Sequence, residues 1–241
     1  MRLFGSETMN SMLEKLGLKD GESIDHPWIN KAIERAQQKV EARNFDIRKT
    51  LIKFDNVLND QRHVIFSQRK NAMNSSQIFD YSNDFLKDII DDLIELKIQK
   101  SKDIKNINFD NKLRLILGKR IKDGEIENLK SLDNKDLREK IIKEFETARK
   151  NRNQILGEDN SKELEKRIFL QTIDMNWTSH IQYLEQLRQV IGLRSYGQRD
   201  PLIEYKKEAF VLFENLLDKL KLDFITILIN LTVTKKISDD E

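Results

Sequence analysis

The chain has 241 residues, of which 35% are charged and 38% hydrophobic, and it contains no cysteine, which excludes disulfides and thiolate metal sites. The 43 Lys and Arg nearly balance the 41 Asp and Glu, which argues against a binder of duplex nucleic acid with its usual basic excess. Only 8 glycines and 2 prolines interrupt the chain, so an all-α fold with long, solvated helices is predicted. No apolar run approaches the length of a transmembrane span, and no signal peptide is expected.

The first segment, residues 1–25, is short and is broken by Gly5, Gly17 and Gly21. LFGSETMNSMLEKLGL predicts one short helix that stops at Gly17. We expect this segment to be the end of a structure that begins upstream.

A long helix is predicted over residues 26–70, because Pro27 suits a first helical position and no further glycine or proline follows before Gly118. Its apolar residues form two rows with a spacing of seven, namely Ile33, Val40, Ile47 and Phe54, and Leu51, Leu58 and Ile65. The stripe is interrupted at Arg43 and Asn44, whereas a self-pairing coiled coil prefers cleaner heptads. We therefore expect a scaffold strut that contacts several bodies.

Residues 71–160 contain shorter helical segments, with turns marked by Gly118, Gly124 and Gly157. Asn, Asp and Ser at the heads of these segments are plausible helix caps. We expect a separate small helical domain here, inserted between two parts of the scaffold.

Two amphipathic patterns occupy residues 161–231. The apolar residues of the first are predicted to share one face, namely Leu164, Ile168, Ile173, Trp177, Ile181, Leu184, Leu187 and Ile191. The second pattern opens with Asp200 as a cap and Pro201 at the first helical position. Joined by a short turn, the two patterns predict an antiparallel αα-hairpin, and residues 232–241 are expected to form a flexible tail.

No catalytic, metal or cofactor site is predicted in the chain itself. It has no G-x-x-x-x-G-K-[ST] loop, and GKRIKDG at Gly118 lacks the required spacing. His26, His63 and His180 are far apart and outside any metal-ligand spacing, and His180 is expected to be a packed, hydrogen-bonded residue. The basic runs RNFDIRK and ARKNRNQ are expected to be solvated helix faces.

The predicted hairpin turn, IGLRSYGQRD, carries a tyrosine among arginines and glycines. Tyr196 offers apolar area at a small cost in rotamer entropy and can contact many sequences without reading one. Gly192 and Gly197 are expected to let the turn form, and Arg194 and Arg199 can donate hydrogen bonds to carbonyl groups. From these residues alone, a tyrosine that packs back on the hairpin is equally compatible.

Three blocks of the sequence resemble the SecA family of bacterial preprotein translocase motors. HPWINKAIERAQQKVE and RNFDIRKTLIKFDNVLNDQRHVIFSQR are similar to its long scaffold helix. LQTIDMNWTSHIQYLEQLRQVIGLRSYGQRDPLIEYKKEAFVLFENLL is similar to its two-helix finger, and MRLFGSETMNSMLEKLGL to the end of its second motor domain. The blocks follow the family's order, whereas residues 71–160 match its helical wing domain only in position and helical character.

The resemblance implies that the Walker motifs and the sites for ATP and Mg²⁺ lie in motor domains before Met1, so this chain alone is not expected to hydrolyse ATP. It implies that the finger tip contacts the polypeptide and the channel through Tyr196, Arg194, Arg199, Gly192 and Gly197. It also implies that the long helix couples the motor to the finger, and the residues predicted to make the interdomain contacts are Arg43, Asp46, Arg48, Asp55 and Arg62.

The partners implied by the resemblance are the SecYEG channel, an unfolded preprotein, the N-terminal motor domains and a second copy in a homodimer. The implied location is the bacterial cytoplasm and the cytoplasmic face of the inner membrane. Two other functions remain open. A stand-alone helical adaptor would self-associate through residues 29–65 and melt in a concentration-dependent way. A nucleic-acid binder, the weakest hypothesis, would lose affinity steeply with salt.

Overall fold

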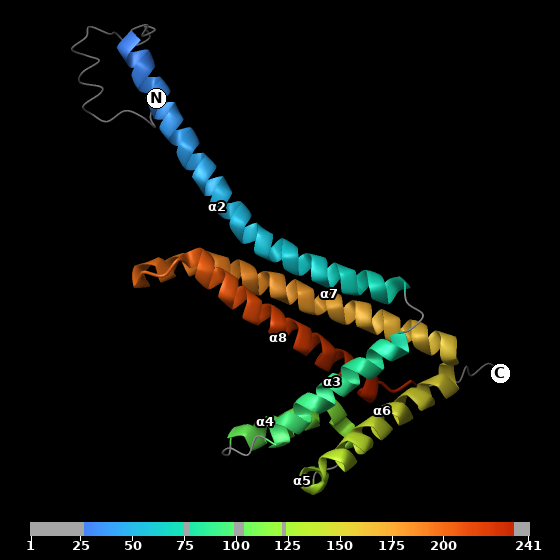
Figure 1. Cartoon of the computed structure of the whole chain (residues 1–241). Helices are drawn as coiled ribbons and strands as arrows, with labels where there is room; N and C mark the ends of the chain where they lie inside the picture. The colour runs from blue at the N-terminus through green and yellow to red at the C-terminus, as the bar shows by residue number, and fades with distance from the viewer. Residues whose placement is uncertain (1–26, 75–77, 99–103, 122–123, 234–241) are drawn as a thin grey trace, which may run out of the picture. The chain divides into compact units, whose positions relative to one another are not determined.

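The computed structural model of the chain describes residues 27–74, 78–98, 104–121 and 124–233, and within these ranges every regular element is a helix. The elements are α2 (Pro27–Asn74), α3 (Ile78–Ile98), α4 (Ile104–Leu117), η1 (Gly118–Arg120), α5 (Glu125–Ser131), α6 (Asn134–Leu156), α7 (Glu158–Val190), η2 (Ile191–Gly197) and α8 (Pro201–Asn230) (Figure 1). The predicted all-α class is confirmed. The helix predicted within residues 1–25 and most of the predicted tail lie outside the described residues.

The chain divides into two compact units, residues 1–56 and 57–241. In the described part of the first unit, α2 begins at Pro27, as predicted. The apolar row that predicted this helix is exposed in the unit, with Ile33, Val40, Ile47 and Leu51 all open to solvent. The first unit therefore presents an apolar helix face that none of its own described residues covers.

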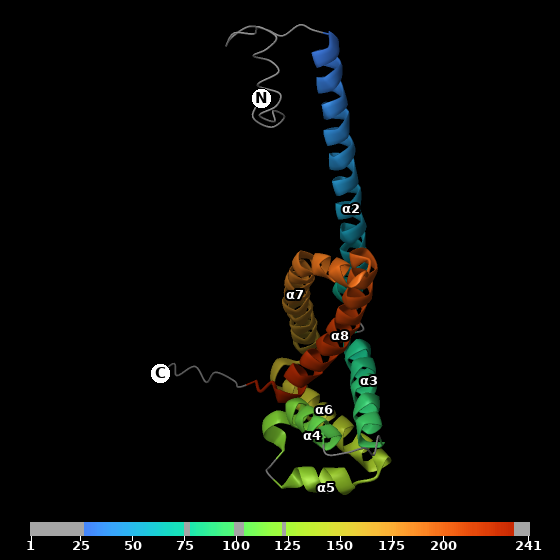
Figure 2. The ribbon, with the colours of Figure 1, turned by 90° about the vertical axis from the view of Figure 1, so that its left-hand side faces the viewer.

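The second unit is organised around the predicted antiparallel hairpin, in which α7 leads through η2 into α8 (Figures 1 and 2). Asp200 caps α8 as expected, because its Oδ1 accepts hydrogen bonds from the backbone N–H groups of Leu202 at 2.8 Å and Ile203 at 3.4 Å. Pro201 follows in the first turn, where its missing N–H costs nothing.

The segment expected to form a separate wing shares one core with the hairpin. The last turns of α8 are apolar on several faces, and Phe224, Ile225, Leu228 and Ile229 are fully buried there. Helices α3, α4 and α6 pack around this end of α8, where Phe85, Phe169 and Phe224 form an aromatic cluster with ring centroids 5.0 to 6.2 Å apart. A helix with such an end requires cover on several sides, because burying each large apolar side chain stabilises the fold by about 1.5–3 kcal/mol.

The ends of the wing helices differ from the prediction in one respect and agree with it in another. The N-cap of α6 is Asp133, and its side chain makes no capping hydrogen bond. Gly118, Gly124 and Gly157 do mark turns, and each has a positive φ. At Gly118 an added Cβ would lie 2.3 Å from Oδ1 of Asn230, so that side chain would have to shift, and the φ of 51° itself favours glycine.

The buried face of α7 also differs from the predicted one. Several residues of the predicted apolar face are only half-buried, including Leu164, Ile168, Trp177, Ile181 and Leu187. The buried residues of α7 are Ser161, Glu165, Phe169, Thr172, Ile173, Asn176, His180 and Leu184. The apolar pattern predicted the wrong set of buried residues, because most of the buried positions of α7 carry polar side chains.

Candidate functional site

The hairpin tip is formed by η2 and the three residues that follow it. Ile191 is buried and anchors the start of η2, whereas Leu193 is 66% exposed and Tyr196 is 88% exposed. Tyr196 therefore does not pack back on the hairpin, which was the alternative left open by the sequence. The tip presents its aromatic ring and a neighbouring leucine to solvent.

Both tip arginines are paired with glutamates of α8. Nη2 of Arg194 lies 2.8 Å from Oε1 of Glu208, and Nη1 of Arg199 lies 3.2 Å from Oε2 of Glu204. Desolvation acts to raise the pKa of Glu204, but the hydrogen bond from Arg199 and the charges of Lys207 and Arg199 outweigh it and lower the pKa overall. In this conformation the arginines brace the tip against α8.

The two tip glycines do not have the role that was expected of them. Gly192 and Gly197 lie within η2, neither has a positive φ, and a Cβ on either would meet nothing within 4 Å. The chain reverses instead at Gln198, which has a φ of 57°. The expectation that these glycines allow the turn is wrong, because the 3₁₀ turn continues the helical backbone and the left-handed residue comes after it.

The residues predicted to couple the long helix to other domains are all exposed along α2, namely Arg43, Asp46, Arg48, Asp55 and Arg62. Their exposure is compatible with contacts to domains outside this chain, and their coupling role stays a prediction.

The structure places a different residue of α2, Gln61, against both hairpin helices. Its Nε2 donates to the carbonyl oxygen of Ala209 on α8 at 3.0 Å, and its Oε1 lies 2.7 Å from Nε2 of His180 on α7. No pattern of residues pointed to Gln61, since glutamine is ordinarily a surface residue of a helix.

His180 is buried and hydrogen-bonded, which confirms the prediction for this residue. The centroid of its ring lies 5.6 Å from that of Trp177 and 5.8 Å from that of Phe213. Burial lowers the pKa of His180, so the neutral imidazole is favoured at neutral pH. Of the other two histidines, His63 is exposed and His26 lies outside the described residues.

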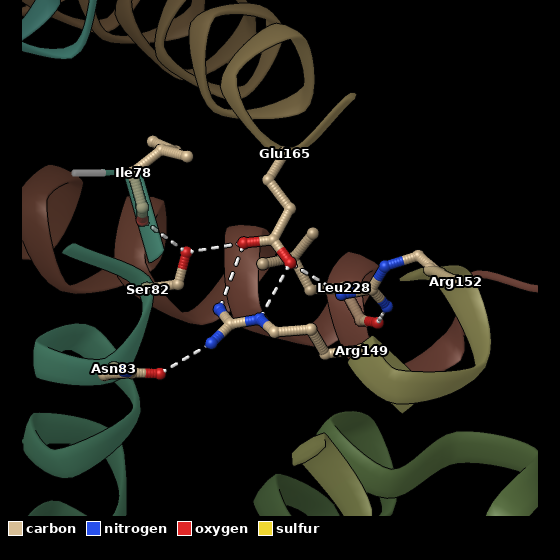
Figure 3. A network of polar contacts seen from close by, with 7 residues as sticks. All are labelled: Ile78, Ser82, Asn83, Arg149, Arg152, Glu165 and Leu228. Atoms are coloured by element: carbon tan, nitrogen blue, oxygen red, sulfur yellow. Dashed lines mark hydrogen bonds and ion pairs between the residues drawn. The ribbon is translucent and has the colours of Figure 1, made fainter. Parts of the chain in front are cut away.

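A second buried polar cluster, centred on Glu165 of α7, joins α3, α6 and α7 (Figure 3). Arg149 of α6 binds the carboxylate in a bidentate manner, with Nε 3.1 Å from Oε1 and Nη2 3.0 Å from Oε2. Arg152 adds a bond from Nη2 to Oε1 at 2.7 Å, and the hydroxyl of Ser82 donates to Oε2 at 2.9 Å. Glu165 is fully buried, so these four donors replace its hydration.

The two arginines extend this cluster to neighbouring helices. Arg152 is 1% exposed and also donates from Nη1 to the carbonyl oxygen of Leu228 on α8. Burial lowers the pKa of Arg152, and the hydrogen bond to Glu165 opposes this shift. Arg149 donates to Asn83 of α3 at 2.8 Å and lies 4.3 Å from the centre of the Phe79 ring. The prediction that ARKNRNQ is a solvated helix face is wrong for Arg149 and Arg152, because the carboxylate of Glu165 binds both side chains inside the protein.

The described residues contain no group of three or more His, Asp or Glu side chains that could hold a metal ion. In the same part of the chain, every helix is too short or too polar to cross a membrane.

Comparison with known proteins assigns the chain to a family. The family model of the SecA Wing and Scaffold domain matches residues 23–232. The chain is 66% identical over 239 residues to the Protein translocase subunit SecA of Pelagibacter ubique (strain HTCC1062), and the match covers 99% of this chain and 28% of that relative. The chain thus spans little more than a quarter of the relative's length. The matched region contains the long helix, the helical hairpin and the helices that lie between them in the sequence. This chain belongs to the SecA family.

Proposed function

We propose that this chain is the scaffold, wing and polypeptide-contacting part of a SecA-type protein translocase. The tip of the α7–α8 hairpin contacts an unfolded preprotein and the SecYEG channel, and α2 couples the hairpin to motor domains that bind ATP and Mg²⁺. The chain by itself does not hydrolyse ATP. The intact protein works in the bacterial cytoplasm and at the cytoplasmic face of the inner membrane, and can form a homodimer.

The observation that carries this proposal is the exposure of Tyr196, which is 88% open at the end of a braced hairpin. An aromatic ring on a rigid support loses little conformational entropy when it contacts another chain. Its contact area is apolar, so it can engage many sequences of an unfolded polypeptide without side-chain-specific recognition. Leu193 enlarges the apolar surface beside it.

The exposed apolar row of α2 supports the coupling part of the proposal. Ile33, Val40, Ile47 and Leu51 are exposed apolar side chains of one helix, on which the motor domains pack. The exposed charges on the same helix, among them Arg43, Asp46 and Arg48, supply polar contacts at the rim of that surface.

Site-specific crosslinking tests the tip. Because this chain has no cysteine, Tyr196→Cys introduces a single thiol into it, and cysteines elsewhere in the intact protein are replaced. Tyr183→Cys is the matched control, since Tyr183 is also an exposed tyrosine of the hairpin, at 61%. We expect a stalled preprotein and the channel to crosslink to position 196 and not to position 183. Equal labelling of both positions, or of neither, contradicts the proposal.

The same exposed row of α2 favours a second candidate function, a helical adaptor that pairs with partner helices. An adaptor would self-associate through this row, and its melting temperature would rise with protein concentration. A sedimentation experiment that finds only monomer across the accessible concentration range rules this function out.

A further inference from the structure

The contact between α2 and the rest of the second unit is narrow. Within residues 57–73, the buried side chains of α2 are those of Gln61, Ile65 and Ala72, which follow one another along one face of the helix. An ion pair between Arg69 and Asp174 of α7 lies beside this seam. Apolar contacts are not directional, so Ile65 and Ala72 favour contact without fixing how far α2 is shifted or rotated against its neighbours.

Gln61 is the polar member of this seam, and its amide joins both helices of the hairpin. It is 7% exposed, and it bonds the Ala209 carbonyl at 3.0 Å and the His180 ring at 2.7 Å. Hydrogen bonds of this length require both partners to keep their distance and angle, so a shift of α2 along its axis breaks both bonds.

The orientation of the amide follows from its partners. The carbonyl oxygen of Ala209 can only accept, so the NH₂ group of Gln61 faces it. The amide oxygen therefore faces His180, whose Nε2 must carry the hydrogen that it donates. The ring is held in place by Trp177 on its own helix and by Phe213 on α8. Three helices thus contribute to one geometrically defined contact.

We propose that Gln61 is the positioning residue that sets the register of α2 against the α7–α8 hairpin. A displacement of α2 is then passed to the hairpin instead of being lost by slippage along an apolar seam. A buried polar residue that fixes helix register at some cost in stability is a known physical device. The claim that a movement of α2 reaches the hairpin tip rests on the function proposed above, whereas the register of α2 is a property of this chain alone.

A double variant separates register from stability. Gln61→Leu alone would leave the His180 N–H buried without an acceptor, so it is combined with His180→Phe, which replaces both partners with apolar groups of similar size. Such paired replacement is close to neutral for stability. Ile65→Val is the matched control, because it removes apolar packing from the same seam and leaves both hydrogen bonds in place.

Register is measured as the distance between spin labels on the exposed positions Phe66→Cys of α2 and Tyr183→Cys of α7. We expect one narrow distance in the otherwise unchanged chain. The double variant should lose this single distance and keep its Tm, and Ile65→Val should keep the distance and lower the Tm. A double variant that keeps the narrow distance overturns the proposal, as does an Ile65→Val chain that loses it.

The intact translocase supplies a second readout. The double variant should retain ATP hydrolysis and lose preprotein movement per ATP, while a thiol at position 196 still crosslinks to the preprotein. Unchanged movement per ATP overturns the coupling role of Gln61. Absence of crosslinking in the parent protein refutes the function proposed for the tip instead, and the spin-label result is unaffected.

Discussion

Nη2 of Arg152 lies 2.7 Å from Oε1 of Glu165, and neither side chain is more than 1% exposed. The two residues are on adjacent helices, α6 and α7, so their ion pair holds the segment first expected to be a separate wing against the hairpin. Arg149 binds the same carboxylate, which means that one buried negative charge serves two arginines. This arrangement makes the cluster sensitive to the loss of Glu165.

Glu165→Gln should destabilise the second unit strongly, because it leaves the buried Arg152 without a counter-ion. Breaking a buried ion pair from one side costs about 3–5 kcal/mol. Urea unfolding of the purified chain measures the change. Glu163→Gln is the matched control, since Glu163 lies on the same helix with a side chain that is 62% exposed, and such surface changes stay within about 0.5 kcal/mol. Similar costs for the two substitutions would show that the cluster does not hold the helices together.

The stability of the chain should fall as the pH drops below about 6.5, the ordinary pKa of histidine. Burial lowers the pKa of His180 in the folded state, so the unfolded chain binds a proton at a higher pH than the folded chain does. The stabilising contribution is therefore complete above the unfolded pKa and is lost as the pH falls from there toward the folded pKa.

Thermal melts of the parent chain and of His180→Phe, taken between pH 5 and 7.5, isolate this contribution from that of the carboxylates. The parent Tm should decline more steeply with falling pH than the Tm of the variant. His63→Gln, at an exposed position, should follow the parent curve. Parallel curves for the parent and His180→Phe would mean that His180 does not change its protonation on unfolding in this range.

Gly118→Ala should destabilise the chain, whereas Gly192→Ala should not. The added Cβ at Gly118 would lie 2.3 Å from Asn230, whose side chain is held by bonds to the carbonyls of Ile116 and Thr226, and φ is +51° there. A non-glycine residue in such a conformation costs about 1–3 kcal/mol before the clash is counted.

Gly192 has open space around its Cβ position and no positive φ, so alanine should be neutral or should stabilise its helical turn by up to about 1 kcal/mol. Chemical denaturation of the two variants gives the comparison directly. An equal loss of unfolding free energy in Gly192→Ala and Gly118→Ala would show that the tip does need a glycine at position 192.

Removing the two tip braces should loosen the tip with little effect on global stability. Glu204→Gln combined with Glu208→Gln weakens the pairs with Arg199 and Arg194, and exposed ion pairs contribute only about 0–1 kcal/mol each. Amide hydrogen exchange at residues 195–199 should accelerate, while exchange at the core residues Phe224 and Leu228 should stay slow.

Lys87→Gln is the control for this experiment, because it removes an exposed ion pair with Asp84 in α3, far from the tip in sequence. It should leave exchange at residues 195–199 unchanged. If hydrogen exchange at residues 195–199 is also unchanged in the double variant, the backbone alone holds η2 in place, and the arginines are available for other contacts.

Local sequence features were sufficient for the helices and for several of their ends. Pro27 opens α2, and Asp200 with Pro201 opens α8, because capping and the fixed φ of proline act within a few residues. The hairpin followed from two long amphipathic patterns separated by a short turn, and a tyrosine was recognisable as an unusual residue for such a turn, although only the structure decided that Tyr196 is exposed. These features depend on neighbours in the sequence, so the sequence by itself determined them.

The tertiary structure decided which polar residues are buried. Glu165, Gln61 and Arg152 have the composition of a solvated helix face, and periodicity of apolar residues assigns them to the outside. They can be buried only because helices distant in sequence supply hydrogen-bond partners and counter-charges that replace water. The same long-range packing places α3, α4 and α6 around the end of α8, since the free energy of covering that apolar surface arises only when the assembled helices meet.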